Sequence, residues 1–163
     1  MKKIKIIGLN IGSGASSPTG RGFFDSKNKT FCYIPLNEVC EQRIKFTYRD
    51  LNNPTVNKNV LDLACHYDPE FKTFTYGHIQ RGFGDHILYK PDLLEDSNVY
   101  LFFYATLNID NNPLNWGTFI IGFLEVEKII NVTGFSNEKI FSLTEFKNNA
   151  HLRRKEPFKK NKK

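Results

Sequence analysis

Cysteine is scarce in this sequence, and its spacing matches no familiar framework. The 163 residues include three cysteines, Cys32, Cys40 and Cys65, with no C-x-x-C pair. Their odd number and spacing fit neither a disulfide framework nor a structural zinc site. Cys65 and His66 are neighbours, so on an extended segment they point to opposite faces and are poorly placed to share one metal ion. We therefore expect reduced thiols, no metal and no cofactor.

Long apolar runs are missing as well. No stretch approaches the roughly 18 unbroken apolar residues of a membrane-spanning helix. The first residues, MKKIKIIGLNIGSG, run into polar and glycine positions where a signal peptide would need an apolar core and a cleavage site. We expect a cytoplasmic protein without membrane contact. Its 163 residues, 40% of them hydrophobic, suffice for one domain with its own core.

An excess of one charge is missing from most of the chain. Residues 153–163 hold seven of the 23 cationic side chains and one of the 17 acidic ones, so the first 152 residues carry 16 of each sign. The formal net charge of +6 therefore lies entirely in the C-terminal segment. Such a tail attracts phosphates without sequence preference, and a solubilising terminus explains it equally well. We expect one domain over residues 1–154 and a basic, disordered tail over residues 155–163.

β-Branched and aromatic residues are abundant, with 15 phenylalanines and seven tyrosines. Runs of these residues predict strands, and helix signals are few. Thr144 can cap a short helix over Glu145–Leu152 whose charges follow the helix dipole, and a second helix is allowed over Asn37–Arg43. Loops are expected over Gly12–Gly22 and Tyr67–Asp85. The expected strands are Lys3–Asn10, Thr30–Leu36, Ile44–Asp50, Val60–His66, Val99–Leu107 and Gly117–Ile130.

The last two strands have the pattern of a long hairpin. A polar loop of about ten residues is expected between them. Gly122 interrupts the second strand at a point where a barrel strand could bend. We therefore predict a β-rich α+β fold with a curved, barrel-like sheet and one or two short helices.

Sequence motifs of an independent active site are missing too. Gly8, Gly12 and Gly14 follow a strand, but Ser17 and Pro18 stand where the helix of a dinucleotide-binding loop should begin. No Lys-Ser or Lys-Thr pair follows to make a phosphate-binding P-loop. There is no G-x-S-x-G elbow, and the four histidines lie in no motif with a serine or cysteine. Whether the protein is an enzyme stays open at this point.

Aromatic residues with polar neighbours are the remaining chemical signal. Tyr76, Tyr104 and Trp116 lie in expected loops or at strand ends. There an aromatic ring can stack on a splayed-out base while a nearby amide or carbonyl reads the edge of the base. Most phenylalanines are instead expected in the core. We expect Tyr76, Tyr104 and Trp116 to face a ligand.

One stretch of the chain resembles the PUA-like group of barrels, which includes the EVE, ASCH and YTH domains. The stretch ends its first strand in Phe103-Tyr104-Ala105-Thr106 and resumes at Gly117–Ile130. Asp96-Ser97 stands where those families usually have Gly-Asp, so the turn matches only in part. The resemblance implies a PUA-like barrel.

A closer resemblance covers most of the chain. Five blocks, in order and at similar spacing, are similar to the nucleotide modification associated domain 3 family: Gly20–Glu38, Asp68–Gly77, Leu101–Leu107, Gly122–Ile129 and Asn149–Arg154. That family is linked to DNA-base modification systems by genomic context. The resemblance therefore implies an association with modified nucleic acid, without a known reaction.

Three functional hypotheses follow. The leading one is a domain that binds nucleic acid or a modified nucleotide, with the base in a pocket and C-terminal cations on the backbone. The alternative is an enzyme of base or nucleotide modification that uses the Gly20–Glu38 and Asp68–His78 loops, in which Asp25, Asp68, His78 and His151 must converge. The third is a partner-binding subunit with an exposed apolar patch. The expected ligand-binding residues are Asp25, Asp68, Tyr76, His78, Tyr104, Thr106 and Trp116, and the expected backbone-binding residues are Arg153, Arg154, Lys155, Lys159 and Lys160.

Overall fold

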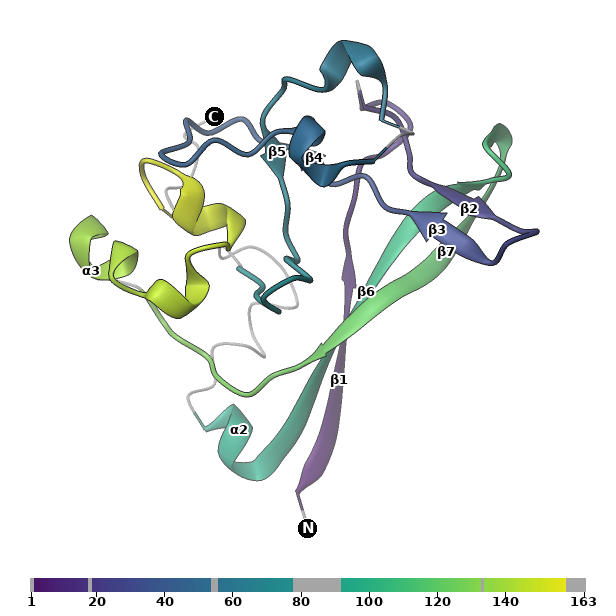
Figure 1. The fold of residues 1–163 in the computed structure, drawn as a ribbon. Helices are drawn as coiled ribbons and strands as arrows, with labels where there is room; N and C mark the ends of the chain where they lie inside the picture. The colour runs from purple at the N-terminus through teal and green to yellow at the C-terminus, as the bar shows by residue number, and fades with distance from the viewer. Residues whose placement is uncertain (1, 18, 54–55, 78–91, 133, 158–163) are drawn as a thin grey trace.

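A long antiparallel hairpin forms the centre of the molecule (Figure 1). Its strands are β6 (Ser97–Ile109) and β7 (Asn112–Glu125). β1 (Lys3–Asn10) pairs in parallel with the first part of β6, with Lys3 opposite Ser97. These elements belong to a computed structural model that describes residues 2–17, 19–53, 56–77, 92–132 and 134–157.

Three shorter pairings make up the rest of the described sheets. β2 (Phe23–Asp25) continues the β1 edge by pairing in parallel with the end of β6. β3 (Thr30–Cys32) pairs antiparallel with β2. A separate two-stranded sheet joins β4 (Leu36–Asn37) to β5 (Cys65–His66). Both sheets are open in the described part of the chain, so the β-rich α+β class is confirmed, whereas barrel closure and a PUA-like topology stay predictions.

The described helices are all short. There are two α-helices and four 3₁₀ turns among the described residues, so the expectation of one or two short helices is met in number but not in position. They are α2 (Leu93–Asp96), α3 (Asn137–Phe141), η1 (Tyr48–Leu51), η2 (Lys58–Val60), η3 (Thr144–Phe146) and η4 (Ala150–Arg153). None of the described helices is long and apolar enough to cross a membrane.

β6 separates the inside of the molecule from the outside. Its residues alternate between buried and partly exposed, as the two-residue period of a strand requires. The odd-numbered side chains, such as Leu101, Phe103 and Leu107, pack with Ile7, Ile121 and others in the main core. A second buried cluster around Ile34, Tyr48 and Cys65 lies under the β4–β5 sheet. The even-numbered side chains of β6 face the other way.

Several expected elements are wrong in type or extent. The helix over Glu145–Leu152 is two 3₁₀ turns, because Asn149 lies between them in an extended conformation and caps the second turn. No helix forms over Asn37–Arg43, since Leu36 and Asn37 pair with β5. The strand expected over Ile44–Asp50 is replaced by η1, and most of Val60–His66 is irregular. Turn chemistry and local capping outweighed the strand propensity of these short apolar runs.

The ten-residue loop expected between the long strands is also wrong. Both strands extend until Ile109 pairs with Asn112, which leaves a two-residue turn. Asp110 and Asn111 adopt positive φ angles of 51° and 57°, the conformation that a tight hairpin turn requires and that Asp and Asn tolerate. The Asp110 carboxylate also accepts hydrogen bonds from the backbone and hydroxyl of Ser26, both at 2.7 Å. This contact ties the β2–β3 hairpin to the end of β6.

Candidate functional site

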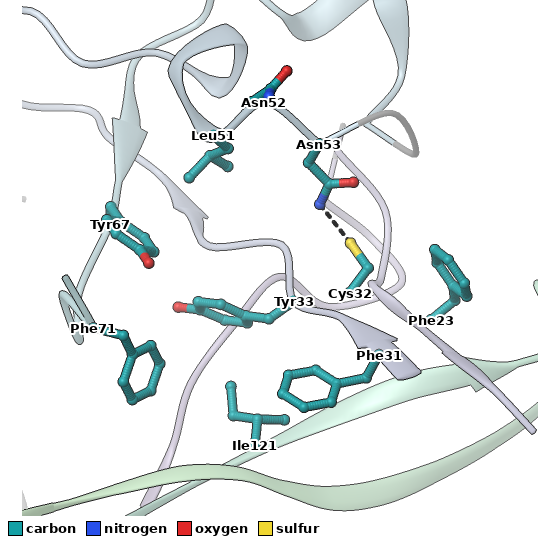
Figure 2. Close-up of a pocket in the computed structure, with 10 residues that line it drawn as sticks. All are labelled: Phe23, Phe31, Cys32, Tyr33, Leu51, Asn52, Asn53, Tyr67, Phe71 and Ile121. Atoms are coloured by element: carbon teal, nitrogen blue, oxygen red, sulfur yellow. Dashed lines mark hydrogen bonds between the residues drawn. The ribbon is translucent and has the colours of Figure 1, made fainter. Parts of the chain in front are cut away.

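A cavity of about 600 Å³ opens on the inner side of the sheet (Figure 2). Half of the described residues that line it are aromatic, and the polar side chains among them are of uncharged types. The aromatic residues are Phe23, Phe31, Tyr33, Tyr67 and Phe71, and the others are Cys32, Leu51, Asn52, Asn53 and Ile121. None of these ten residues is an Asp, Glu, Lys, Arg or His. Their only ionisable groups are the thiol of Cys32 and the phenols of Tyr33 and Tyr67, which are weak acids.

Two glycines leave room for the aromatic walls. A Cβ atom on Gly12, whose φ is +95°, would lie 3.0 Å from Cε2 of Tyr33. A Cβ atom on Gly122 would lie 2.8 Å from Cε1 of Phe71. Such contacts are too close for carbon atoms, so any larger residue would displace a ring. Gly122, which the sequence pattern marked as a possible bend, therefore lets the Phe71 ring approach β7.

Tyr67 and Tyr33 are held from behind. The ring of Tyr67 stacks on the ring of Phe46, with centroids 5.7 Å apart. The guanidinium of Arg153 lies over the same Phe46 ring, 4.1 Å from its centroid. The hydroxyl of Tyr33 donates to the backbone oxygen of Asp68 at 3.3 Å. Burial, followed by the nearby Asp68 charge, raises the pKa of Tyr33 well above its usual value. These contacts therefore hold the Tyr67 and Tyr33 rings in place, and Tyr33 is neutral.

Asn52 and Asn53 bring amide groups to the cavity. They follow η1, and Asn52 ends this turn in the left-handed conformation with a φ of 50°, which asparagine adopts more readily than most residues. The Asn53 amide nitrogen donates to the Cys32 thiol (Figure 2). Amides can both donate and accept hydrogen bonds, so this end of the cavity can read the edge of a heterocycle.

A buried polar cluster lies next to the cavity, on the opposite side of the Tyr67 segment. Its members come from three of the sequence blocks that carry the family resemblance and from β5. They are Glu38, His66, Asp68, Asn149, His151 and Arg154. These segments are far apart in the sequence and meet only in the folded chain.

Arg154 and Glu38 form the charged centre of the cluster. Nε and Nη2 of Arg154 donate to the two oxygens of Glu38 at 2.9 and 3.1 Å. Nδ1 of His66 lies 2.8 Å from Oε2 of the same carboxylate. Burial by itself would raise the pKa of Glu38, but the hydrogen bonds from His66 and Arg154 outweigh it and lower the pKa to about 2. Glu38 is therefore ionised, and His66 carries its proton on Nδ1.

The tautomer of His151 is the opposite one. Its Nδ1 lies 3.1 Å from Nη1 of Arg154, which can only donate, so Nδ1 must accept. Its Nε2 then carries the proton and lies 3.2 Å from the backbone oxygen of Gly77 and 3.3 Å from Oδ2 of Asp68. Burial, more than any other influence, lowers the pKa of His151. His151 is therefore neutral and donates to Asp68 or Gly77.

The same tautomer bears on metal binding. Single ligand atoms of His66, Asp68 and His151 all lie within 4.8 Å of one another, and Glu38 holds His66 as a second-shell carboxylate would. A metal ion would need a free electron pair on Nε2 of His151. The proton of His151 would then have to move to Nδ1, where it would face the N–H group of Arg154. The donor set therefore has the residue types of a metal site, but Arg154 opposes the required protonation.

The structure brings only some of the expected ligand-binding residues together. Asp68 lies in the polar cluster, where its carboxylate accepts from the backbone N–H of Gly77 at 3.1 Å. Tyr76 packs on the core, with its ring centroid 5.3 Å from that of Phe103. Asp25 is bonded within its own turn to Lys27 and Asn28. His78 lies outside the described residues.

The other three expected ligand-binding residues lie together on a different surface. Tyr104, Thr106 and Trp116 project from the outer face of the β6–β7 hairpin, away from the cavity. The ring of Tyr104 lies against Gly8 of β1, where a Cβ atom would be 3.5 Å from it. The guanidinium of Arg21 lies 5.0 Å from the ring centroid of Trp116, which is 56% exposed.

The expected backbone-binding cations are also divided. Arg154 is buried in its ion pair with Glu38, and Arg153 lies over Phe46. Lys155 is exposed and pairs with Glu41. Lys159 and Lys160 fall outside the described residues. Pro157 is buried, so packing extends past the boundary expected at residue 154.

Sequence reasoning missed most of the cavity and of the polar cluster beside it. Tyr33 and Glu38 lie inside a block that carries the family resemblance, and Tyr67 was noted only as one aromatic residue of a loop. His66 was considered only as the neighbour of Cys65. Asn52 and Asn53 lie in an Asn-Asn-Pro stretch, which is typical of a turn and by itself gives no signal of binding.

Together these features define a β-rich domain with a neutral aromatic cavity supported by a buried ion-pair cluster. The family model described as nucleotide modification associated domain 3 matches residues 5–162. The chain therefore belongs to this family, as its five sequence blocks predicted. No curated protein and no solved structure matches it.

Proposed function

We propose that the domain binds the base of a nucleotide, either free or within a nucleic-acid chain, in the aromatic cavity. The observation that carries the proposal is the combination of five aromatic rings with amide groups in one cavity of about 600 Å³, with no Asp, Glu, Lys, Arg or His among its described lining residues. This volume lies in the range of ligand-binding pockets. The family description, which refers to nucleotide modification, supports the same class of ligand.

The chemistry of the wall favours a base over a phosphate. Aromatic rings stack on every base, and each stacked base contributes about 1–3 kcal/mol. Tyr67 is suited to this role because Phe46 already holds its ring in place, so binding orders little. Asn52 and Asn53 supply the hydrogen bonds that would distinguish one base, or one modified base, from another.

Phosphate contacts then lie outside the cavity. Arg153 and Lys155, together with the lysines of the tail, are the cations we assign to the nucleic-acid backbone. Arg154 was expected to share this role, but a phosphate contact would compete with its ion pair to Glu38. Its main contribution in this proposal is to hold the polar cluster behind the cavity.

Calorimetric titration with nucleosides and with short single- and double-stranded DNA and RNA, with and without modified bases, tests the proposal. Tyr67→Leu keeps apolar volume but removes the aromatic surface, and it should weaken binding about tenfold or more. Phe74→Ala is the matched control, because Phe74 is an exposed aromatic side chain that does not line the cavity. The proposal fails if the protein binds none of these ligands, or if both variants bind equally well.

A catalytic function has one specific observation in its favour. Asp68 and His151, two of the four residues that an enzyme was expected to bring together, lie 3.3 Å apart. Asp25 is bonded within its own turn instead, and His78 is outside the described residues. Product analysis by mass spectrometry after incubation with nucleotides and DNA distinguishes the two functions, because a pure binding domain leaves every substrate unchanged.

A further inference from the structure

The outer face of the central sheet is apolar and uncovered among the described residues. It is formed by alternate residues of β1, β6 and β7, which the strand register places in adjacent rows. Ile6, Ile120 and Phe123 are 66%, 67% and 59% exposed. Monomeric proteins rarely leave contiguous apolar patches of this kind in water. We define the apolar face as Ile4, Ile6, Phe102, Tyr104, Ile120 and Phe123.

Charge distinguishes between possible occupants of this face. The alternating rows carry one acidic side chain, Glu125, opposite Tyr100 at one end. The cation at the other end is Arg21, which lies over Trp116. A nucleic-acid strand would require several cations along its path, whereas the described rows of β1, β6 and β7 on this face carry none, and Arg21 lies beside one end of them. Its apolar centre with charges only at the ends is the composition of a protein–protein interface.

The two charges are placed symmetrically. Glu125 pairs with Tyr100, and Trp116, beneath Arg21, pairs with Asn108. At about 3.3 Å per residue these two positions on β6 are roughly 26 Å apart. Tyr104, paired with Ile120, lies midway between them. A second copy turned end over end about this midpoint would bring its own acidic end to the basic end of the first.

We propose that two copies of this chain associate through the apolar face. The two sheets pack face to face about a two-fold axis that lies between them, perpendicular to β6 and level with Tyr104. Arg21 of each copy then approaches Glu125 of the other. Sheets packed in this way lie about 10 Å apart with interdigitated side chains. The cavity lies on the opposite side of the sheet, so this inference does not depend on the proposed function.

The apolar part of the inference is tested by measuring molar mass with light scattering over a range of protein concentrations. Ile120→Asp should raise the dimer dissociation constant by at least about tenfold, because it buries an unpaired charge at the centre of the interface. Val39→Asp is the matched control, since Val39 is exposed outside this face. Circular dichroism checks that both variants fold.

The orientation is tested by charge exchange. Arg21→Glu and Glu125→Arg should each weaken the dimer, and the double variant should recover much of the loss. The two residues are too far apart in one copy to restore each other, so recovery identifies contacts between copies. A monomeric wild-type protein at all concentrations overturns the proposal, as does a dimer that Ile120→Asp leaves intact. A monomer whose oligonucleotide binding is lost in Ile120→Asp would instead identify a nucleic-acid surface.

Discussion

Arg154 and Glu38, 116 residues apart in the chain, form a two-pronged ion pair with nitrogen–oxygen distances of 2.9 and 3.1 Å. Both side chains are almost completely buried. The pair connects the C-terminal turn η4 to the segment after β4. A buried charge that loses its partner is costly, so this ion pair adds to the backbone hydrogen bonds that hold the C-terminal segment against Glu41–Ile44.

Replacement of Arg154 by methionine should destabilise the protein by about 3–5 kcal/mol, because it leaves the Glu38 charge buried without its cation. Urea denaturation measures the free energy of unfolding. Lys155→Met is the matched control: Lys155 pairs with Glu41 at the surface, where such pairs contribute about 0–1 kcal/mol. Equal stability of the two variants would contradict the assigned importance of the buried pair.

Stability should fall in two stages as the pH is lowered. The pKa of His151 is below its usual 6.5 in the folded protein, so below pH 6.5 the unfolded chain takes up a proton that the folded chain does not. The pKa of Glu38 is about 2 instead of 4.5. The stability that the ionised Glu38 contributes is therefore lost as the pH falls from 4.5 towards 2. Both effects therefore disfavour the folded state in acid.

The stability–pH profile, measured by urea denaturation between pH 8 and pH 3, checks this sign. His151→Gln should flatten the slope between neutral pH and about pH 5, whatever its effect on absolute stability. An unchanged slope would mean that His151 is not held neutral.

The substitution Gly122→Ala should disturb the cavity from a distance. Its Cβ would lie 2.8 Å from the Phe71 ring, and the strain should cost about 1–3 kcal/mol. Gly14→Ala serves as the control, because nothing lies within 4 Å of its Cβ position. Thermal unfolding and ligand titration should both distinguish the two variants. If Gly122→Ala keeps full stability and binding, the Phe71 ring is not a fixed wall.

Metal removal should leave the protein unchanged. Arg154 holds His151 with its proton on Nε2, so this nitrogen has no free electron pair to offer a divalent ion beside His66 and Asp68. Neither a chelator nor added zinc or manganese should shift the melting temperature by more than about a degree. A large shift that Asp68→Asn abolishes would show that the tautomer changes and a metal binds.

Removal of residues 158–163 should weaken non-specific nucleic-acid binding and leave stability intact. This deletion takes away four lysines, and each lysine that contacts a phosphate of double-stranded DNA contributes about 0.9 to the slope of log affinity against log salt. Deletion from Lys155 onward should also destabilise the fold, because it removes Pro157, which is buried, and the backbone bond from Lys155 to Glu41. An unchanged salt slope would mark the tail as a solubilising end.

The sequence alone determined the long strands, the β-rich class and the family. β1 begins and ends where its run of apolar and β-branched residues predicted, and β6 contains the whole expected strand Val99–Leu107, because long alternating runs specify their burial locally. β7 overlaps the expected strand Gly117–Ile130 but begins five residues before it and ends five residues short of its end. The five blocks identified the family without any knowledge of contacts. The short elements failed, because two or three residues of strand or helix depend on what they pack against.

Only the tertiary structure decided which residues form a site. Glu38, His66 and Arg154 have no common pattern in the sequence, and their charges are controlled by burial and by one another. Tyr104 and Trp116 are of residue types that often stack on ligands, but their position in the strand register places them on the face opposite the cavity. Successive side chains of a strand point to opposite faces of the sheet. The register with the neighbouring strands therefore determines which side chains come together on each face.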